Sequence, residues 1–248
     1  MKVRFQLLTL IYLILCLFSG LLYQVLILYL CLCVHELGHL VVIKLFKKKV
    51  TLLEISPIGG ILYLDGCQND RNFKELLIYL GGPLFSFSLY FLVRFFKLNE
   101  VFIASSYYIF LMNLIPIIPL DGGKIIMTLK QYFIPYKLVL KLISVFSVIT
   151  GIILVIICIK TTSLSIILMS FIYINLKNYL NISEEYFTFL WYKYLHPNKK
   201  LPKKIIISRL IDKHIIYHHF YKGYHHVFFL EHQLLDEEDV LKRLLISK

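Results

Sequence analysis

The sequence carries little charge for its length. Only 17% of its 248 residues are Asp, Glu, Lys or Arg, whereas 58% are hydrophobic and the mean hydropathy is +0.74. This composition excludes an ordinary soluble domain and predicts a membrane protein with several spans. Acidic residues are scarcer than basic ones, at 15 against 27. In a membrane protein this excess indicates cytoplasmic loops next to anionic lipid, and we expect no direct binding of nucleic acid.

Cysteine is also scarce, and its distribution excludes a disulfide framework. The five cysteines are scattered, four of them in apolar segments, so a reduced, membrane-buried state is expected. Internal repeats and low-complexity tracts are absent. The apolar run after Lys2 and Arg4 has no small-residue cleavage site, so we expect no cleavable signal peptide.

The apolar run from Phe5 to Phe46 contains the pattern H-E-x-x-H, from His35 to His39. On a helix, His35 and His39 project from one face, so both imidazoles can reach one zinc ion at about 2.0–2.1 Å. Glu36 can then take a proton from water rather than bind the metal. The alternative is an apolar helix with two incidental histidines paired to Glu36. It is disfavoured because ionisable groups at bilayer depth are costly unless they have a function.

Asp121 is the candidate third ligand that a catalytic zinc site needs. It is the single carboxylate between residues 100 and 184, and it follows Pro116 and Pro119. The prolines break the helix and bend Asp121 inward, and Gly122-Gly123 permits a close approach of backbone to metal or substrate. The alternative, that Asp121 is an N-cap in a Pro/Gly loop, is disfavoured next to an intramembrane H-E-x-x-H.

The predicted chemistry is hydrolysis of a peptide bond. Zn²⁺ on these three ligands leaves the fourth position to water, and Glu36 acts as the general base that returns the proton to the leaving amine. Asn113 and Pro119 are predicted to bind substrate, with Asn113 donating a hydrogen bond to the substrate backbone or the developing oxyanion.

Span counting predicts six transmembrane helices. The run from Phe5 to Phe46 would be about 60 Å long as one helix, twice a hydrocarbon core, so we expect two spans with a turn at Ser19-Gly20. Lys and Arg gather on one side of this topology, which predicts that both termini are cytoplasmic. The four further spans are expected at Phe73–Phe96, Val101–Ile118, Leu138–Ile159 and Leu164–Leu180.

Residues 50–65 predict a β-hairpin between the second and third spans. Two short β-prone pieces flank Ser56-Pro57-Ile58-Gly59-Gly60, and the segment is too interrupted for a helix. Two interpretations stay open. The hairpin lies at the membrane surface, or it is re-entrant and its edge strand, around Gly59 and Gly60, pairs with an extended substrate.

The composition changes after Ser183, which predicts two domains, 1–183 in the membrane and 184–248 in the cytoplasm. The second segment is charged, holds seven of the nine histidines and is too short for a large core of its own. Its histidines could bind metal, but a solvated basic surface lying against anionic lipid is the favoured interpretation.

The two motifs together resemble the site-2 protease family of intramembrane zinc metalloproteases. That resemblance implies two histidine ligands at 35 and 39, the base at 36 and the aspartate ligand at 121. Further landmarks resemble the sporulation proteases within the family. They are Ser56–Gly60, Gly81-Gly82-Pro83-Leu84 and Phe220–His226.

The resemblance implies a mostly α-helical membrane protein that cleaves membrane-associated proteins within or near the bilayer of a bacterial cell. The sporulation group acts in the mother-cell and forespore membranes, releases a sigma factor from its precursor and is inhibited by membrane regulator proteins. Its tail resembles a CBS domain, an α/β module. This tail holds at best one such module, whereas nucleotide binding usually needs a pair, so ATP binding is left open, as is a homo-oligomeric state.

Three alternatives define what must be tested. The substrate could instead be an anti-sigma factor in stress signalling. A divalent-metal transporter would need polar groups along several spans, and the fifth and sixth predicted spans are almost free of them. A catalytically silent binding protein would normally have lost part of the H-E-x-x-H motif or Asp121, and neither is altered.

Overall fold

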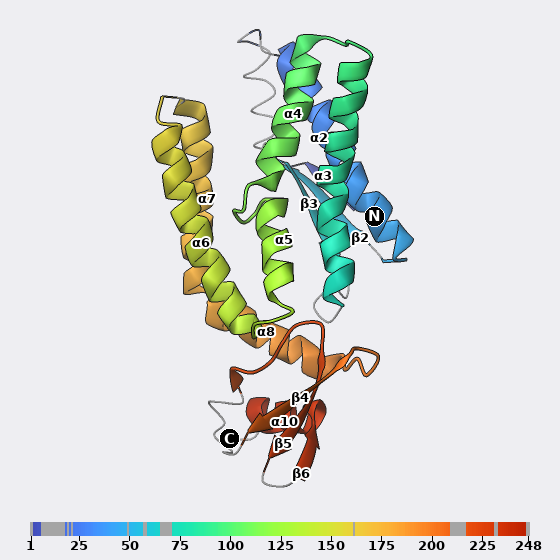
Figure 1. Cartoon of the computed structure of the whole chain (residues 1–248), viewed down its shortest axis with the longest axis vertical. Helices are drawn as coiled ribbons and strands as arrows, with labels where there is room; N and C mark the ends of the chain where they lie inside the picture. The colour runs from blue at the N-terminus through green and yellow to red at the C-terminus, as the bar shows by residue number, and fades with distance from the viewer. Residues whose placement is uncertain are drawn as a thin grey trace. The chain divides into compact units, whose positions relative to one another are not determined.

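The computed structural model describes residues 2–5, 18, 20, 22–48, 50–56, 59–64, 71–160, 162–208, 217–230 and 233–246. The chain divides into two compact units. Figure 1 labels most of their helices and strands. The first unit comprises Met1–Asp65, Leu77–Ile115 and Leu120–Gly122, and the second comprises Gly66–Leu76, Pro116–Pro119 and Gly123–Lys248.

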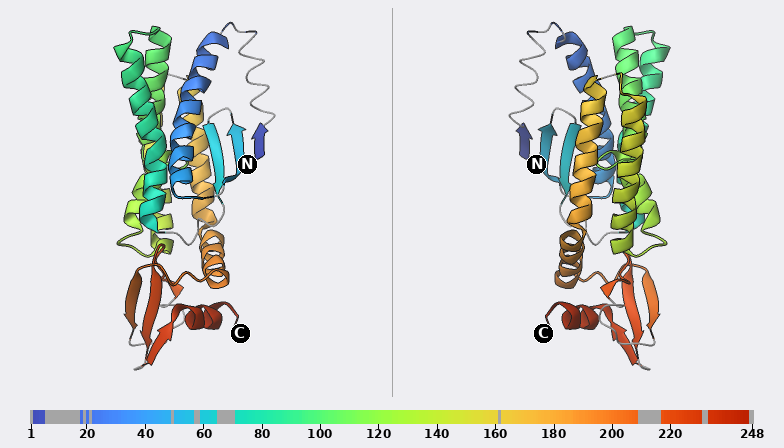
Figure 2. Two further views of the ribbon diagram at one scale, coloured as in Figure 1. Left: turned by 90° about the vertical axis from the view of Figure 1, so that its right-hand side faces the viewer. Right: turned by 90° about the vertical axis from the view of Figure 1, so that its left-hand side faces the viewer.

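The first unit contains a three-stranded sheet in the order β1-β2-β3. Strands β2 (Val50–Ser56) and β3 (Gly59–Leu64) are antiparallel, which confirms the predicted hairpin, although its turn at 57–58 lies outside the described residues. Strand β1 (Lys2–Phe5) lies parallel to β2. Its sequence alternates Lys2 and Arg4 with apolar residues, the period of a strand. Figure 2 shows the three strands, dark blue to cyan, side by side.

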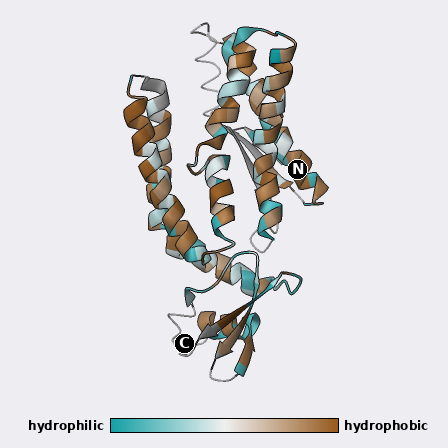
Figure 3. Cartoon of the chain, in the orientation of Figure 1, coloured by the Kyte–Doolittle hydropathy of each residue, from teal (hydrophilic) through white to brown (hydrophobic). Residues whose placement is uncertain are grey.

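Three described helices are long and apolar enough to cross a membrane, namely α2 (Leu22–Leu45), α3 (Asn72–Phe95) and α6 (Tyr136–Ile157). Figure 3 shows their hydrophobic residues in brown. Large apolar side chains such as Phe91 and Ile153 are exposed on them. Hydrocarbon covers such side chains in a bilayer, so these helices are those of a membrane protein. The first predicted span falls almost entirely on residues 6–17, outside the described residues.

The fourth predicted span is interrupted earlier than its apolar run suggests. Helix α4 (Glu100–Leu114) has 15 residues, and a turn separates it from α5 (Asp121–Lys130). Helix α7 (Thr162–Leu180) covers the sixth predicted span and packs against α6. The count of six spans and the orientation of the termini stay predictions.

In the second unit, the C-terminal strands and helix share one hydrophobic core with the start of α6 and with helix α8 (Ile182–Leu195). Helix α8 begins directly after Asn181, so the predicted boundary after Ser183 falls inside it. Strands β4 (Lys203–Ser208) and β5 (His225–Leu230) are parallel, and β5 is antiparallel to β6 (Gln233–Asp236), which leads into α10 (Glu237–Leu245). The buried core consists of Tyr136, Leu140, Ile182, Tyr186, Phe189, Leu190, Phe220, Phe228, Val240 and Leu241.

Candidate active site

Helix α2 presents His35 and His39 on the same buried face. The two residues are 2% and 6% exposed, and their Nε2 atoms are 3.2 Å apart. The rings meet edge to face, with centroids 4.9 Å apart. The four-residue spacing on a helix therefore places both imidazoles on one face, as predicted, and their Nε2 atoms reach the same point.

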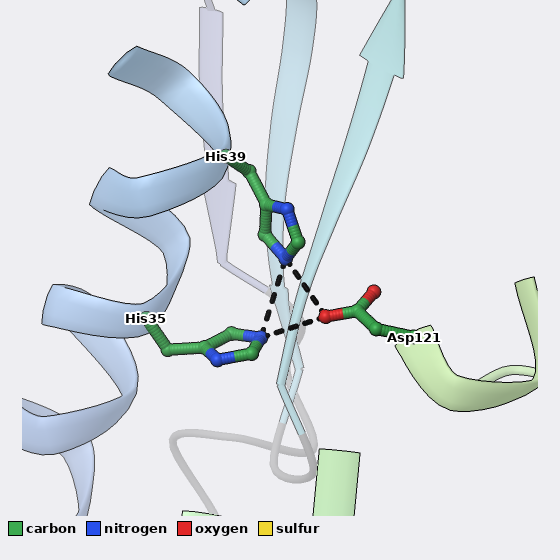
Figure 4. A group of neighbouring side chains, drawn as sticks. All are labelled: His35, His39 and Asp121. Carbon is green, nitrogen blue, oxygen red and sulfur yellow. Dashed lines mark hydrogen bonds and ion pairs between the residues drawn. The ribbon is translucent and has the colours of Figure 1, made fainter. Parts of the chain in front are cut away.

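Asp121 brings the third ligand atom to this point from the first residue of α5. Its Oδ2 atom lies 3.0 Å from Nε2 of His35 and 2.9 Å from Nε2 of His39. Figure 4 shows the three side chains converging from two helices. Asp121 is 4% exposed, so the whole group is removed from water.

The donor set and its spacing fit a zinc ion. Two imidazole nitrogens and a carboxylate oxygen are typical ligands of catalytic zinc, which keeps a fourth position open. Ligand atoms about 2.0–2.1 Å from a tetrahedral ion lie about 3.3 Å from one another. The observed separations are 2.9, 3.0 and 3.2 Å. These atoms can therefore take up an ion with small adjustments.

The other ring nitrogens are held by helix α3. Nδ1 of His39 donates a hydrogen bond of 2.7 Å to the carbonyl oxygen of Ile78, and Nδ1 of His35 lies 2.9 Å from Oγ of Ser86. A proton on Nδ1 leaves Nε2 unprotonated, the form that binds metal. These two partners were not predicted from the sequence. A hydroxyl at the right helical spacing could have suggested Ser86, whereas a backbone carbonyl leaves no sequence signal.

Two glycines let the chain fold tightly around Asp121. A Cβ atom on Gly122 would lie 2.3 Å from the carbonyl oxygen of Leu114, and one on Gly123 would lie 2.6 Å from the carbonyl carbon of Ile117. These glycines therefore make room for the preceding turn of the chain itself. Their predicted role in the approach of backbone to a metal or substrate stays a prediction.

The turn before Asp121 is anchored by polar side chains of α6 and α7. The Ile118–Pro119 peptide bond is cis. Oγ of Ser147 accepts a 3.2 Å hydrogen bond from the amide of Ile118, and Nδ2 of Asn175 donates to the carbonyl oxygen of Ile118 at 2.5 Å. Both side chains are fully buried. Neither residue was predicted from the sequence, because the fifth and sixth predicted spans look nearly apolar.

The remaining predicted residues lie as follows. Glu36 is half-buried on α2 and is not part of the three-residue ligand group. Its role as the general base stays a prediction.

The four predicted substrate-binding residues lie on three different segments. Asn113, on α4, donates a 3.0 Å hydrogen bond to the carbonyl oxygen of Ile109. Pro119 is exposed in the turn before α5. Gly59 and Gly60 lie on β3, opposite Ser56 and Ile55. Substrate binding by these four residues stays a prediction.

Comparisons with known proteins agree with this geometry. Residues 23–99 match the profile of Peptidase family M50. A zinc metalloprotease of Methanocaldococcus jannaschii is 34% identical over 111 residues, which cover 40% of this chain and 32% of that protein. Stage IV sporulation protein FB of Bacillus subtilis is 28% identical over 112 residues, which cover 42% of this chain and 39% of that protein. The chain thus spans less than half the length of these curated relatives.

A solved structure extends the comparison to the fold. The site-2 protease from Methanocaldococcus jannaschii matches with a TM-score of 0.51 and 23% identity, covering 74% of this chain and 89% of that one. These findings confirm the resemblance that the motifs indicated. Residues 23–99, which carry His35, Glu36 and His39, match the peptidase family M50 profile, and the chain has the fold of a solved site-2 protease.

Proposed function

We propose that this protein is an intramembrane zinc metalloprotease of the site-2 type, which cleaves a membrane-associated protein. The observation that carries the proposal is the convergence of His35, His39 and Asp121, whose ligand atoms all lie within 4.8 Å of one another in a buried site. Burying three such groups among apolar helices is costly unless they hold a cation.

The chain's own residues divide the chemistry between binding and proton transfer. His35, His39 and Asp121 hold the ion. When bound, zinc supplies Lewis acidity, which polarises the scissile carbonyl and lowers the pKa of water. Glu36 takes the proton from the attacking water and gives it to the leaving amine, so that one carboxylate serves both steps.

Substrate recognition is proposed to use the edge strand β3 of the β1-β2-β3 sheet. Strand β2 lies between β1 and β3, so β3 has one edge without a neighbour in the described sheet. An extended segment can add to such an edge through main-chain hydrogen bonds, and Gly59 and Gly60 would let it approach closely. Asn113 uses one N–H of its carboxamide within α4, and a second N–H remains for a substrate oxygen.

The substrate is proposed to be a sporulation sigma factor precursor, and the Bacillus subtilis relative supports this choice. An anti-sigma factor in stress signalling is the alternative within the same activity. The remaining proposals concern the setting of the enzyme. The chain is proposed to have six spans with both termini in the cytoplasm, which the distribution of Lys and Arg supports. Its tail is proposed to be CBS-like, which the α/β arrangement of β4, β5, β6 and α10 supports. Inhibitory membrane proteins are the proposed partners.

The test is co-expression with a tagged candidate substrate. Wild-type protein should convert the precursor to a shorter product, and Glu36→Gln should abolish conversion while retaining zinc. Glu100→Gln, an exposed carboxylate at the start of α4, is the matched control and should cleave normally. Conversion by Glu36→Gln at the wild-type rate would refute the proposed function. Parallel assays with a sigma factor precursor and an anti-sigma factor decide between the two substrates.

A further inference from the structure

One face of helix α3 lies against both imidazole rings. Ile78, Gly82 and Ser86 follow one another at intervals of four residues, so they form a single stripe along the helix. The carbonyl oxygen of Ile78 accepts from Nδ1 of His39, and Oγ of Ser86 lies 2.9 Å from Nδ1 of His35. Gly82 lies between these two contacts.

Gly82 has no room for a side chain, and the atoms in the way belong to the ligands. A Cβ atom at this position would lie 2.3 Å from Nε2 and 2.6 Å from Cε1 of His39, and 2.7 Å from Cε1 of His35. Packed carbon atoms normally stay about 3.5–4.0 Å apart. The rings cannot simply turn aside, because each is buried and held at its Nδ1 atom.

The neighbouring glycine has a different task. A Cβ atom on Gly81 would lie 2.7 Å from the carbonyl oxygen of Gly38 and 2.9 Å from Val42, both on α2. Gly81 therefore permits the close approach of α2 and α3. Gly82 permits the histidines to occupy the space between the helices.

We propose that Gly82 and Ser86 are positioning residues of the zinc site. The inference rests on the proposed function, since it concerns the same ion. The stripe acts in two ways. Nδ1 of each histidine is engaged on α3, which directs both Nε2 atoms towards Asp121. The missing side chain at 82 leaves room for Nε2 of His39 and for Cε1 of both rings. Outer partners of this kind typically change metal affinity by about 10–100-fold.

The experiment uses full-length protein in detergent and four variants. Gly82→Ala and Ser86→Ala change the stripe. Gly151→Ala is the control for adding a methyl group inside a spanning helix, because there the methyl would meet Ile172 instead of a ligand. Ser88→Ala is the control for removing a hydroxyl from α3, because Ser88 is exposed and donates to the carbonyl oxygen of Leu84. Zinc affinity is measured by competition with a chelator, and ligand geometry by the visible spectrum of the Co²⁺-substituted protein.

Gly82→Ala should lose stoichiometric zinc, and Ser86→Ala should bind zinc about 10–100-fold more weakly with an altered cobalt spectrum. Both controls should keep the wild-type affinity and spectrum. If Gly82→Ala cannot be recovered folded, Ser86→Ala decides alone, because a lost hydroxyl leaves helix packing nearly unchanged.

Wild-type affinity and spectrum in Ser86→Ala, or wild-type affinity in folded Gly82→Ala, would overturn the inference and leave the proposed function standing. A wild-type protein that binds no zinc would overturn both.

Discussion

Nε2 of His35 and Oδ2 of Asp121 lie 3.0 Å apart although 86 residues separate them in the chain. A neutral amide is a poor zinc ligand, so Asp121→Asn removes one ligand while conserving size. We expect zinc affinity to fall by more than the roughly 10–100-fold typical of an outer partner, with proteolysis lost. Equilibrium dialysis measures the affinity. Asp239→Asn, at an exposed carboxylate, should bind zinc like the wild type, and equal affinity in the two variants would argue against Asp121 as a ligand.

The turn before Asp121 can be tested through Asn175. Its side chain is fully buried and donates hydrogen bonds to the carbonyl oxygens of Ile118 and Phe171. Asn175→Ala leaves the Ile118 carbonyl without this donor, which should lower the free energy of unfolding by about 1–3 kcal/mol and slow proteolysis. Thermal unfolding in detergent measures the first effect. Asn178→Ala is the control. Asn178 is half-buried and lies less than one turn further along α7, and its substitution should be nearly neutral.

A buried ion pair in the C-terminal part predicts a large stability effect. Lys193 on α8 pairs with Glu237 at the start of α10, and their side chains are 1% and 3% exposed. Burial opposes ionisation of Glu237, but His226 and Lys193 together lower its pKa to about 2. Glu237→Gln leaves the Lys193 ammonium buried without its counter-charge, which should cost about 3–5 kcal/mol.

Fluorescence of Trp191, the one tryptophan of the chain, measures this effect because it lies on the same helix as Lys193. Glu238→Gln is the matched control. Glu238 pairs with the exposed Lys199, so its loss should cost at most about 1 kcal/mol. Equal destabilisation by the two variants would contradict the buried-pair argument.

The same cluster predicts a dependence of stability on pH. Burial, reinforced by the charge of Lys193, lowers the pKa of His226 to about 4, although its bond to Glu237 opposes the shift. An unfolded histidine has a pKa of about 6.5, so between about pH 6.5 and 4 the unfolded chain binds a proton that the folded chain does not. The contribution of His226 to stability should therefore be constant above about pH 6.5 and fall by about 1.4 kcal/mol per pH unit below it, about 3 kcal/mol in all.

Denaturant unfolding followed by Trp191 fluorescence at several pH values measures this slope. His226→Gln should flatten the slope between pH 6.5 and 4 whatever its effect on stability at neutral pH. His196→Gln changes an exposed histidine at the C-terminal end of α8 and should keep the wild-type slope. An unchanged slope in His226→Gln would show that another group is responsible.

Local patterns predicted the ligands and much of the helical framework. His35 and His39 share a face because of helical periodicity, Asp121 is a carboxylate in a stretch with few of them, and the hairpin follows from β-prone pieces around a Pro/Gly turn. These signals act over a few residues, which is why they can be identified in a single chain.

Contacts between distant segments could not be predicted in the same way. The hydrogen bond of His39 to Ile78 uses a backbone carbonyl, which every residue possesses. Strand β1 has four residues and gains its partner only when β2 folds beside it. Ser147 and Asn175 look like minor polar interruptions of apolar helices until the position of Ile118 is known.

Helix α8 makes the C-terminal segment difficult to remove. Tyr136 and Leu140, at the start of α6, are covered by a cluster that includes Tyr186 on α8 and Phe228 on β5. A chain shortened to residues 1–183 would leave this cover behind and present aromatic and aliphatic surface to water. Such a truncated chain should aggregate or recruit a foreign hydrophobic surface, so proteolytic clipping within α8 would abolish the proposed activity without touching His35, His39 or Asp121.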